Sequence, residues 1–282
     1  MNFRNPLLTA AALFLTVGAV ACSSDIVGPP ALDDAQINAD IASTSGDAVA
    51  SQVTSFGDDV TAAGSFSIVA PSFSVNVGSG TRPSLNGISP TCTYASGRYT
   101  CSATTEQGLT VTRSFAFYNA QGQTVQNWDS TVVESVNFQA QINGNFSRDL
   151  VWNAAVHRTR NATVSGLISQ KPHRTWNGVG AGADTISHVG LDGIRTLAGT
   201  AADTVTNVVM PGKAATSQVP LSGTIVIAVK YTVSLQGATG TVSKDVQRRV
   251  VVTFNGTTAA GLQIGTLNCV LHLDTHTVDS CQ

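Results

Sequence analysis

Residues 221–235 alternate apolar and polar side chains over their whole length. The odd positions are mainly Leu, Ile, Val and Tyr, whereas the even positions are mainly Ser, Thr, Lys and Ala. Since successive side chains of a strand point to opposite faces, this pattern predicts a long strand with one buried face and one wetter face. The same alternation recurs over residues 109–117, so we expect a chain that is mainly β.

The strand at 221–235 is followed by residues 237–240, which have the composition of a hairpin loop. Closing this loop places Leu235 opposite Val242 and Ile225 opposite Val252. A slip of one residue would set the apolar row against polar side chains, so burial specifies the register. The two stretches are therefore predicted to pair as antiparallel strands.

Three other segments carry turn or glycine signals. A three-residue loop at 143–145 would pair residues 132–142 with residues 146–156 so that apolar side chains face each other. Near the C-terminus the apolar side chains change from even-numbered to odd-numbered positions at Gly265, which predicts a β-bulge. The glycine-rich segment 176–183 is predicted to be a strand with close backbone packing, because no helix follows that would make it a phosphate loop.

Residues 32–63 follow a helical period instead. Val49, Val53, Phe56 and Val60 recur at spacings of four, three and four, which places them on one stripe of a helix. The polar residues 45–47 supply a capping side chain, so we expect two short helices. Their stripe is expected to pack on the apolar face of the sheet or to plug one end of it, and the alternative is a partner-binding helix.

The first residues have the form of an export signal. Arg4 precedes an apolar run and a small-residue site at Ala21, which is the order of a secretory signal over residues 1–21. The run is short for a membrane span. The sequence Ala19-Val20-Ala21-Cys22 resembles the lipobox of bacterial lipoproteins, in which the signal is cut before the cysteine and its sulfur carries a diacylglycerol.

This resemblance implies a lipid on Cys22 and a tether over residues 22–31. It further implies that the membrane is a partner of the protein through this N-terminal anchor. The expected location is the bacterial cell envelope, with the protein anchored to the outer membrane.

The number of cysteines agrees with export. The five cysteines are Cys22, Cys92, Cys101, Cys269 and Cys281. Setting Cys22 aside leaves an even number, which is typical of disulfides in an oxidising compartment. A two-residue turn would place Cys92 opposite Cys101 within disulfide reach, and a Cys269–Cys281 bond would clamp the terminal hairpin.

Composition limits the possible functions. Hydrophobic residues make up 42% of the 282 residues, which is enough for a sizeable core in one large or two small β domains. Charged residues make up only 11%, and the formal net charge is −2 with no basic run. Nucleic-acid binding through phosphate neutralisation is therefore not expected.

Candidate chemistry is sparse. The chain has no Gly-x-Ser-x-Gly elbow, His-Glu-x-x-His pair or phosphate loop, so a non-enzymatic role is predicted. Trp128 and Trp176 are candidates for an aromatic ligand-binding surface. His157 and His173 are further ligand-binding candidates, because each begins a His-Arg-Thr-x-Asn segment that a meander would place two strands apart and pointing the same way.

No metal site or cofactor is predicted. His272, Asp274 and His276 share one strand parity, as the ligands of a metal would. A hairpin turn near Thr275 would, however, break that shared face.

The predicted fold class is mainly β: a long-stranded antiparallel meander over residues 64–282, curved into a half-barrel or open barrel, with one or two short N-terminal helices. In outline it resembles the half-barrels that carry lipids or lipoproteins between bacterial membranes. The expected function is a membrane-anchored envelope lipoprotein with a binding or scaffold role, its partner being an envelope protein or a hydrophobic ligand. The alternatives are a carrier of a hydrophobic or lipid ligand and a hydrolase of envelope polymers.

Overall fold

A computed structural model describes residues 31–65, 92–106, 108–149, 152–168, 172–190, 192–212, 218–279 and 281–282. In this part of the chain one helix, α1 (Asp34–Ser65), precedes a single 13-stranded antiparallel sheet. The strands are β1 (Cys92–Ala95), β2 (Arg98–Glu106), β3 (Leu109–Tyr118), β4 (Thr124–Val125), β5 (Ser135–Asp149), β6 (Trp152–Ser165), β7 (His173–Gly190), β8 (Gly193–Pro211), β9 (Ser222–Gly237), β10 (Gly240–Thr253), β11 (Ala259–Ile264), β12 (Leu267–His272) and β13 (Thr277–Val278). The expected export signal and Cys22 lie outside the described residues.

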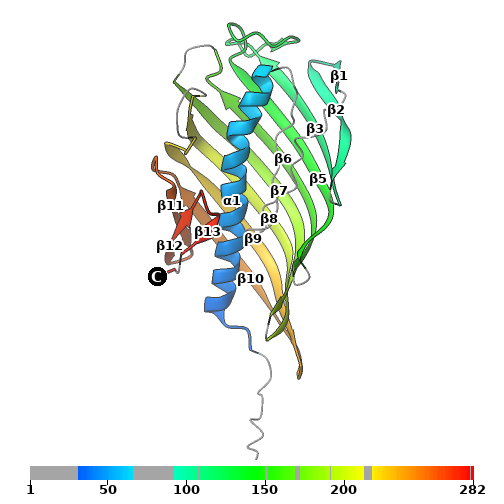
Figure 1. Cartoon of the computed structure of the whole chain (residues 1–282), viewed down its shortest axis with the longest axis vertical. Helices are drawn as coiled ribbons and strands as arrows, with labels where there is room; N and C mark the ends of the chain where they lie inside the picture. Colours follow the sequence, from blue (N-terminus) through cyan, green and yellow to red (C-terminus); the bar gives the residue numbers. More distant parts are fainter. Residues whose placement is uncertain are drawn as a thin grey trace, which may run out of the picture.

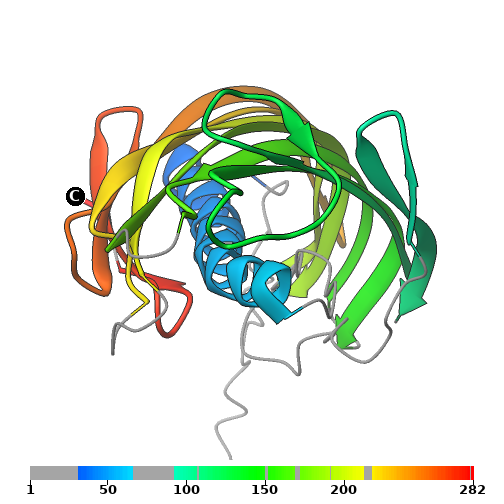
Figure 2. The same cartoon turned by 90° about the horizontal axis from the view of Figure 1, so that it is seen from above.

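The sheet is a meander that curves around α1 without closing. Strand order follows chain order from β1 to β13, except that β4 is a side branch paired with β3. Figure 1 shows α1 running along the hollow of the sheet, and Figure 2 shows the sheet from above as an open arc with the helix inside. The prediction of a mainly β, long-stranded half-barrel with an N-terminal helix is confirmed.

Helix α1 is one continuous helix of 32 residues, so the expected division at residues 45–47 is wrong. A Cβ on Gly46 would lie 2.5 Å from Cγ2 of Val278 and 3.1 Å from Cδ1 of Leu271. The glycine therefore allows the helix to approach the terminal hairpin closely, and it does not end the helix. Val49 and Val53 of the predicted apolar stripe are buried against the sheet, whereas the side chains of Phe56 and Val60 lie outside the part that the structure describes.

The predicted pairing of β9 with β10 is confirmed along the whole hairpin. Leu235 lies opposite Val242 and Ile225 opposite Val252. Both expected disulfides are present, Cys92–Cys101 in the β1–β2 hairpin and Cys269–Cys281 between β12 and the C-terminus. These bonds fasten the chain close to the two ends of the open sheet.

The predicted loop at 143–145 is wrong, because β5 runs straight through these residues. Ile142 consequently lies opposite Arg158 of β6 and not opposite Phe146. Gly144 has a φ of 147°, and a Cβ there would lie 2.0 Å from the carbonyl oxygen of Gly108. The Asn-Gly signal thus marks a close backbone approach beside β3, where only glycine fits.

Gly265 is part of a hairpin turn and not of the expected β-bulge. Strands β11 and β12 pair antiparallel, with Ile264 opposite Leu267. Gly265 adopts a φ of 59°, which suits a glycine in a tight turn. The apolar side chains change from even-numbered to odd-numbered positions there because the chain reverses direction.

Candidate functional site

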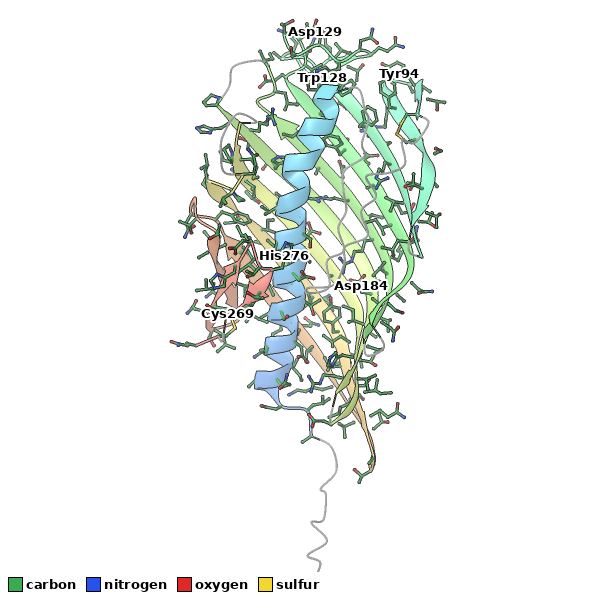
Figure 3. All side chains as sticks on the ribbon, in the orientation of Figure 1. Tyr94, Trp128, Asp129, Asp184, Cys269 and His276 are labelled. Atoms are coloured by element: carbon green, nitrogen blue, oxygen red, sulfur yellow. A yellow bond between two sulfur atoms is a disulfide. The ribbon has the colours of Figure 1, made fainter. Side chains whose placement is uncertain are left out.

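The inner face of the sheet carries charged side chains in the middle of an otherwise apolar surface. These residues, named here the inner charged cluster, are Arg113, Arg158, Arg160, Asp184 and Asp203. They come from β3, β6, β7 and β8, and the strand register places them on neighbouring strands of one face. A small apolar group including Val111, Ile142 and Ile186 forms a separate core cluster. Asp184 lies to one side of α1 in the view of Figure 3.

Arg158 and Asp184 form the centre of this cluster. The Nε of Arg158 donates to both carboxylate oxygens of Asp184, at 2.9 and 3.1 Å, and its Nη2 donates to Oδ2 at 2.7 Å. The Asp184 side chain is fully buried, and that of Arg158 is 25% exposed. Burial lowers the pKa of Arg158, but the hydrogen bonds and charge of Asp184, with smaller contributions from Tyr231 and Asp203, together outweigh burial, so the pKa is raised and the guanidinium stays charged.

Glycines on β7 provide the room for these long side chains. A Cβ on Gly180 would lie 2.1 Å from Oδ1 of Asp203, and one on Gly182 would lie 2.6 Å from Cγ of Arg158. The glycine-rich segment therefore is a strand with close packing, as expected, and what it packs against is the inner charged cluster.

The pKa values of two further side chains in this region, Asp203 and Tyr231, are raised above their usual range. Burial raises the pKa of Asp203, while Arg160 and Arg158 oppose that effect. Burial also raises the pKa of Tyr231 to about 12, with a further contribution from the charge of Asp184. The cluster thus combines an ionised Arg–Asp pair with a carboxyl group that holds its proton more strongly than an exposed aspartate.

Of the two candidate tryptophans, Trp176 is too deeply buried to contribute to a binding surface. Trp176 is only 1% exposed and stacks on Phe138 with ring centroids 6.0 Å apart, so it belongs to the core. Trp128 is half-buried and meets Phe117 edge-to-face at 5.5 Å. Figure 3 shows Trp128 at the end of the molecule where α1 terminates.

The structure does not bring His157 and His173 together. His157 lies opposite Ala183 of β7, whereas His173 begins β7 and lies opposite Pro211. The 10 residues of β7 between these levels separate the two histidines by about 33 Å along the sheet. The repeated segments therefore run on adjacent antiparallel strands, and the expectation that they lie two strands apart and parallel is wrong.

The terminal histidines have separate partners. His272 Nε2 lies 2.9 Å from Oδ2 of Asp279, and this hydrogen bond raises the pKa of His272. His276 Nδ1 lies 3.3 Å from Oδ1 of Asp47 in α1, with both side chains nearly buried. Among the described residues, no group of three His, Cys, Asp or Glu side chains is placed to hold a metal ion.

The outer face of the sheet has the opposite character. An open depression of about 730 Å³ crosses β2, β3, β5, β6 and β7. We name it the outer polar trough, and its outward polar side chains are Arg98, Thr100, Thr112, Ser114, Gln139, Gln141, Thr159 and Asn161.

Hydrogen bonds between strands fix the side chains of the trough. Arg98 Nη1 donates to Oγ of Ser114 at 3.1 Å, and its other terminal nitrogen contacts the amide oxygen of Asn137. The Nδ2 of Asn137 donates in turn to Oδ1 of Asn161 at 2.7 Å. The trough is therefore a preset surface of amides and hydroxyls that both donate and accept, with the guanidinium of Arg98 on β2.

Comparison with protein-family models, with curated proteins and with solved structures found no match for this chain. Among the described residues, no helix combines the length and the apolar character that a membrane span requires.

Proposed function

We propose that this chain is an exported, lipid-anchored protein of the bacterial cell envelope with a non-enzymatic binding or scaffold role. The lipobox-like residues ending at Cys22 support the anchor. The two disulfides support an oxidising compartment outside the cytoplasm. In this proposal the half-barrel is a rigid frame that presents a binding surface away from the membrane tether.

The observation that carries the proposal is the outer polar trough. It spans five strands of one continuous sheet, so its side chains sit on rigid elements. Its amides and hydroxyls suit a hydroxyl-rich, largely uncharged polymer, because such a ligand offers both donors and acceptors. We therefore propose envelope glycan strands as the bound partner.

A sedimentation assay with purified insoluble sacculi tests this binding. The lipid-free protein is expected to sediment with sacculi, and the double variant Gln139→Ala/Asn161→Ala is expected to remain mostly in the supernatant. The control Thr200→Ala/Ser234→Ala alters outward polar residues of β8 and β9 beyond the trough. Equal sedimentation of both variants and the unaltered protein would remove the trough from the proposal.

The anchor is tested separately by inhibiting lipoprotein signal processing. Globomycin is expected to cause accumulation of an uncleaved precursor, and Cys22→Ser is expected to abolish the diacylglycerol mass on the mature protein. A mature mass that is the same with and without the drug would exclude the lipid anchor while leaving the trough untouched.

A carrier role for the hollow is the second candidate, favoured by the curvature of the sheet around α1 (Figure 2). Phe115, Phe138 and Trp176 on the inner face are, however, already buried by other side chains of the protein. A ligand would therefore have to displace part of the protein itself. Native mass spectrometry of the soluble protein decides the point, since co-purified lipid supports a carrier and a clean apo mass counts against one.

The hydrolase alternative has one favourable observation, which is that burial raises the pKa of Asp203 beside the Arg158–Asp184 pair. An acid of this kind is a requirement of glycoside hydrolysis. Release of soluble fragments from sacculi by the unaltered protein, lost in Asp203→Asn, would support it.

A further inference from the structure

Strand β10 is only partly covered on the side away from β9. It pairs with β9 over its whole length, from Gly240 to Thr253. On the other side, β11 pairs only with residues 250–253. Among the residues that the structure describes, none pairs with this side of residues 240–249, which therefore form a free edge within the sheet, and most of them are exposed.

The direction of the backbone groups along this edge follows from one hydrogen bond. The N–H of Phe254 donates to the carbonyl oxygen of Gly223 at 3.0 Å, so residue 254 is hydrogen-bonded toward β9. Bonded and non-bonded pairs alternate in an antiparallel ladder, so the even-numbered residues of β10 point their backbone groups to β9. The odd-numbered residues point theirs to the free edge, and these are Thr241, Ser243, Asp245, Gln247 and Arg249.

No backbone partner reaches these five residues from any other described element. One edge carbonyl has a side-chain partner, since Nη1 of Arg248 donates to the oxygen of Gln247 at 2.9 Å. The same guanidinium donates through Nε to Asn38 of α1 at 2.7 Å. The free edge thus lies beside the first turns of α1, at the end of the described chain that leads to the predicted tether (Figure 1).

The charges around the edge favour an acidic occupant. Arg249 lies on the outer side of the edge, and Lys230 of β9 lies opposite Gln247 on the same face. The nearby carboxylate of Asp245 accepts a hydrogen bond from Oγ1 of Thr232 at 2.6 Å. A strand added here would lie directly beside Arg249, with Lys230 one strand further back on the same face, and opposite charges on paired strands attract.

A second copy of the chain fits this edge poorly. A twofold pairing confined to residues 241–249 places Asp245 directly opposite Asp245 of the second copy, and like charges in that position are destabilising. Shifting the pairing toward residue 253 is blocked because β11 already occupies that side. Shifting it the other way leaves fewer edge residues paired.

We propose that the free edge of β10 receives an extended, acidic segment of a partner polypeptide, which adds a strand to the sheet. The main-chain groups of the five odd residues supply the hydrogen bonds, and Arg249, with the longer-range charge of Lys230 behind it, selects acidic side chains. The inference goes beyond the proposed function, because it uses a different surface from the trough and does not require the lipid anchor.

The test uses a blocked nine-residue peptide, Glu-Val-Glu-Val-Thr-Val-Thr-Val-Thr, whose two Glu residues would face Arg249 and Gln247 in the antiparallel register. Residue-resolved amide exchange by NMR is the readout. At about 1 mM peptide, exchange of the five odd N–H groups is expected to slow about tenfold, as a Kd of about 0.1 mM gives. The N–H groups of Lys244 and Val246, already bonded to β9, are expected to change little.

The variant Gln247→Pro removes one edge donor and leaves the β9 ladder intact, because proline is tolerated where the N–H faces away from a partner strand. It is expected to lose the peptide-dependent protection. Gln247→Ala keeps the N–H and is expected to retain protection. Circular dichroism confirms that both variants are folded.

Four results would overturn the proposal. The first is unchanged exchange of the odd N–H groups on adding peptide, which would mean that the charges of the edge only prevent strand addition. The second is equal peptide-dependent protection in Gln247→Pro, and the third is equal protection by a peptide with Lys in place of Glu. The fourth is a dimer of the protein alone that Gln247→Pro abolishes. Sedimentation with sacculi and globomycin processing are independent of each of these results.

Discussion

Replacing Asp184 by asparagine is expected to cause the largest loss of stability among the polar substitutions in this protein. The carboxylate is fully buried and accepts three hydrogen-bond contacts from one guanidinium. The substitution Asp184→Asn keeps the shape of the side chain but leaves the Arg158 charge without its counter-ion. Removing one partner of a buried ion pair costs about 3–5 kcal/mol in general.

The structure places the expected value at the lower end of this range. Arg158 retains 25% side-chain exposure, so water solvates part of its charge after the substitution. An asparagine oxygen still accepts one hydrogen bond from the guanidinium. We therefore expect Asp184→Asn to lower the free energy of unfolding by about 3 kcal/mol, or the Tm by about 6–12 °C for a domain of this size.

Urea unfolding at pH 7 measures the change, followed by tryptophan fluorescence because Trp176 is buried. The double variant Arg158→Met/Asp184→Leu is the matched control, and it is expected to unfold within about 1 kcal/mol of the unaltered protein because well-packed apolar residues can replace a buried pair. A loss below about 1 kcal/mol in Asp184→Asn would refute the reasoning. So would a double variant no more stable than the single one.

Three further predictions follow from the same face of the sheet and from the terminal hairpin. Gly199→Ala is expected to destabilise the fold by about 3 kcal/mol in urea unfolding, because the new Cβ would lie 2.0 Å from a carbonyl oxygen of β9 and the backbone cannot move away. Gly261→Ala is the near-neutral control, since its Cβ would meet nothing closer than 3.9 Å. The raised pKa of Asp203 means that the folded state holds this proton more tightly than the unfolded state, so its contribution to stability is present below pH 3.8 and is lost as pH rises through the raised value. Asp203→Asn should flatten that part of the stability–pH curve, and an unchanged curve would contradict the assignment. The pKa of His272, raised by its hydrogen bond to Asp279, should fall toward 6.5 in Asp279→Asn, as followed by NMR titration of the imidazole.

The hairpins that the sequence predicts correctly are those in which local and distant signals agree. In β9 and β10 the alternation is clean on both strands, and the loop between them permits only one register that buries the apolar row. The hairpin expected at residues 143–145 failed because its local turn chemistry competes with a longer ladder. Pairing β5 with β6 through Ser135 and Ser165 uses more backbone bonds, and the neighbouring β3 requires Gly144 to stay within the strand.

The inner charged cluster escaped prediction for a related reason. Arg158 and Arg160 occupy even-numbered positions of β6, like Val156 and Val164, so they point inward. Alternation of apolar and polar residues alone would assign these charged side chains to the solvent-exposed face. Their counter-charges and the glycines that accommodate them lie on strands whose register is set by non-local pairing. The sequence does contain a signal for this cluster. Two arginines occupy the alternate positions that are otherwise apolar in one strand, and the next strand has glycine at alternate positions.

The placement of these charges suggests what they contribute to folding. In the middle of β7 both faces carry small residues, with Gly180 and Gly182 inside and Ala181 and Ala183 outside. Apolar burial therefore specifies the register of this strand only weakly, and weakly specified strands slip. A slip of one residue against β6 would turn Asp184 outward and leave Arg158 buried without its carboxylate, which is a penalty of several kcal/mol. We infer that the ion pair fixes the register in the part of the sheet where side-chain size cannot.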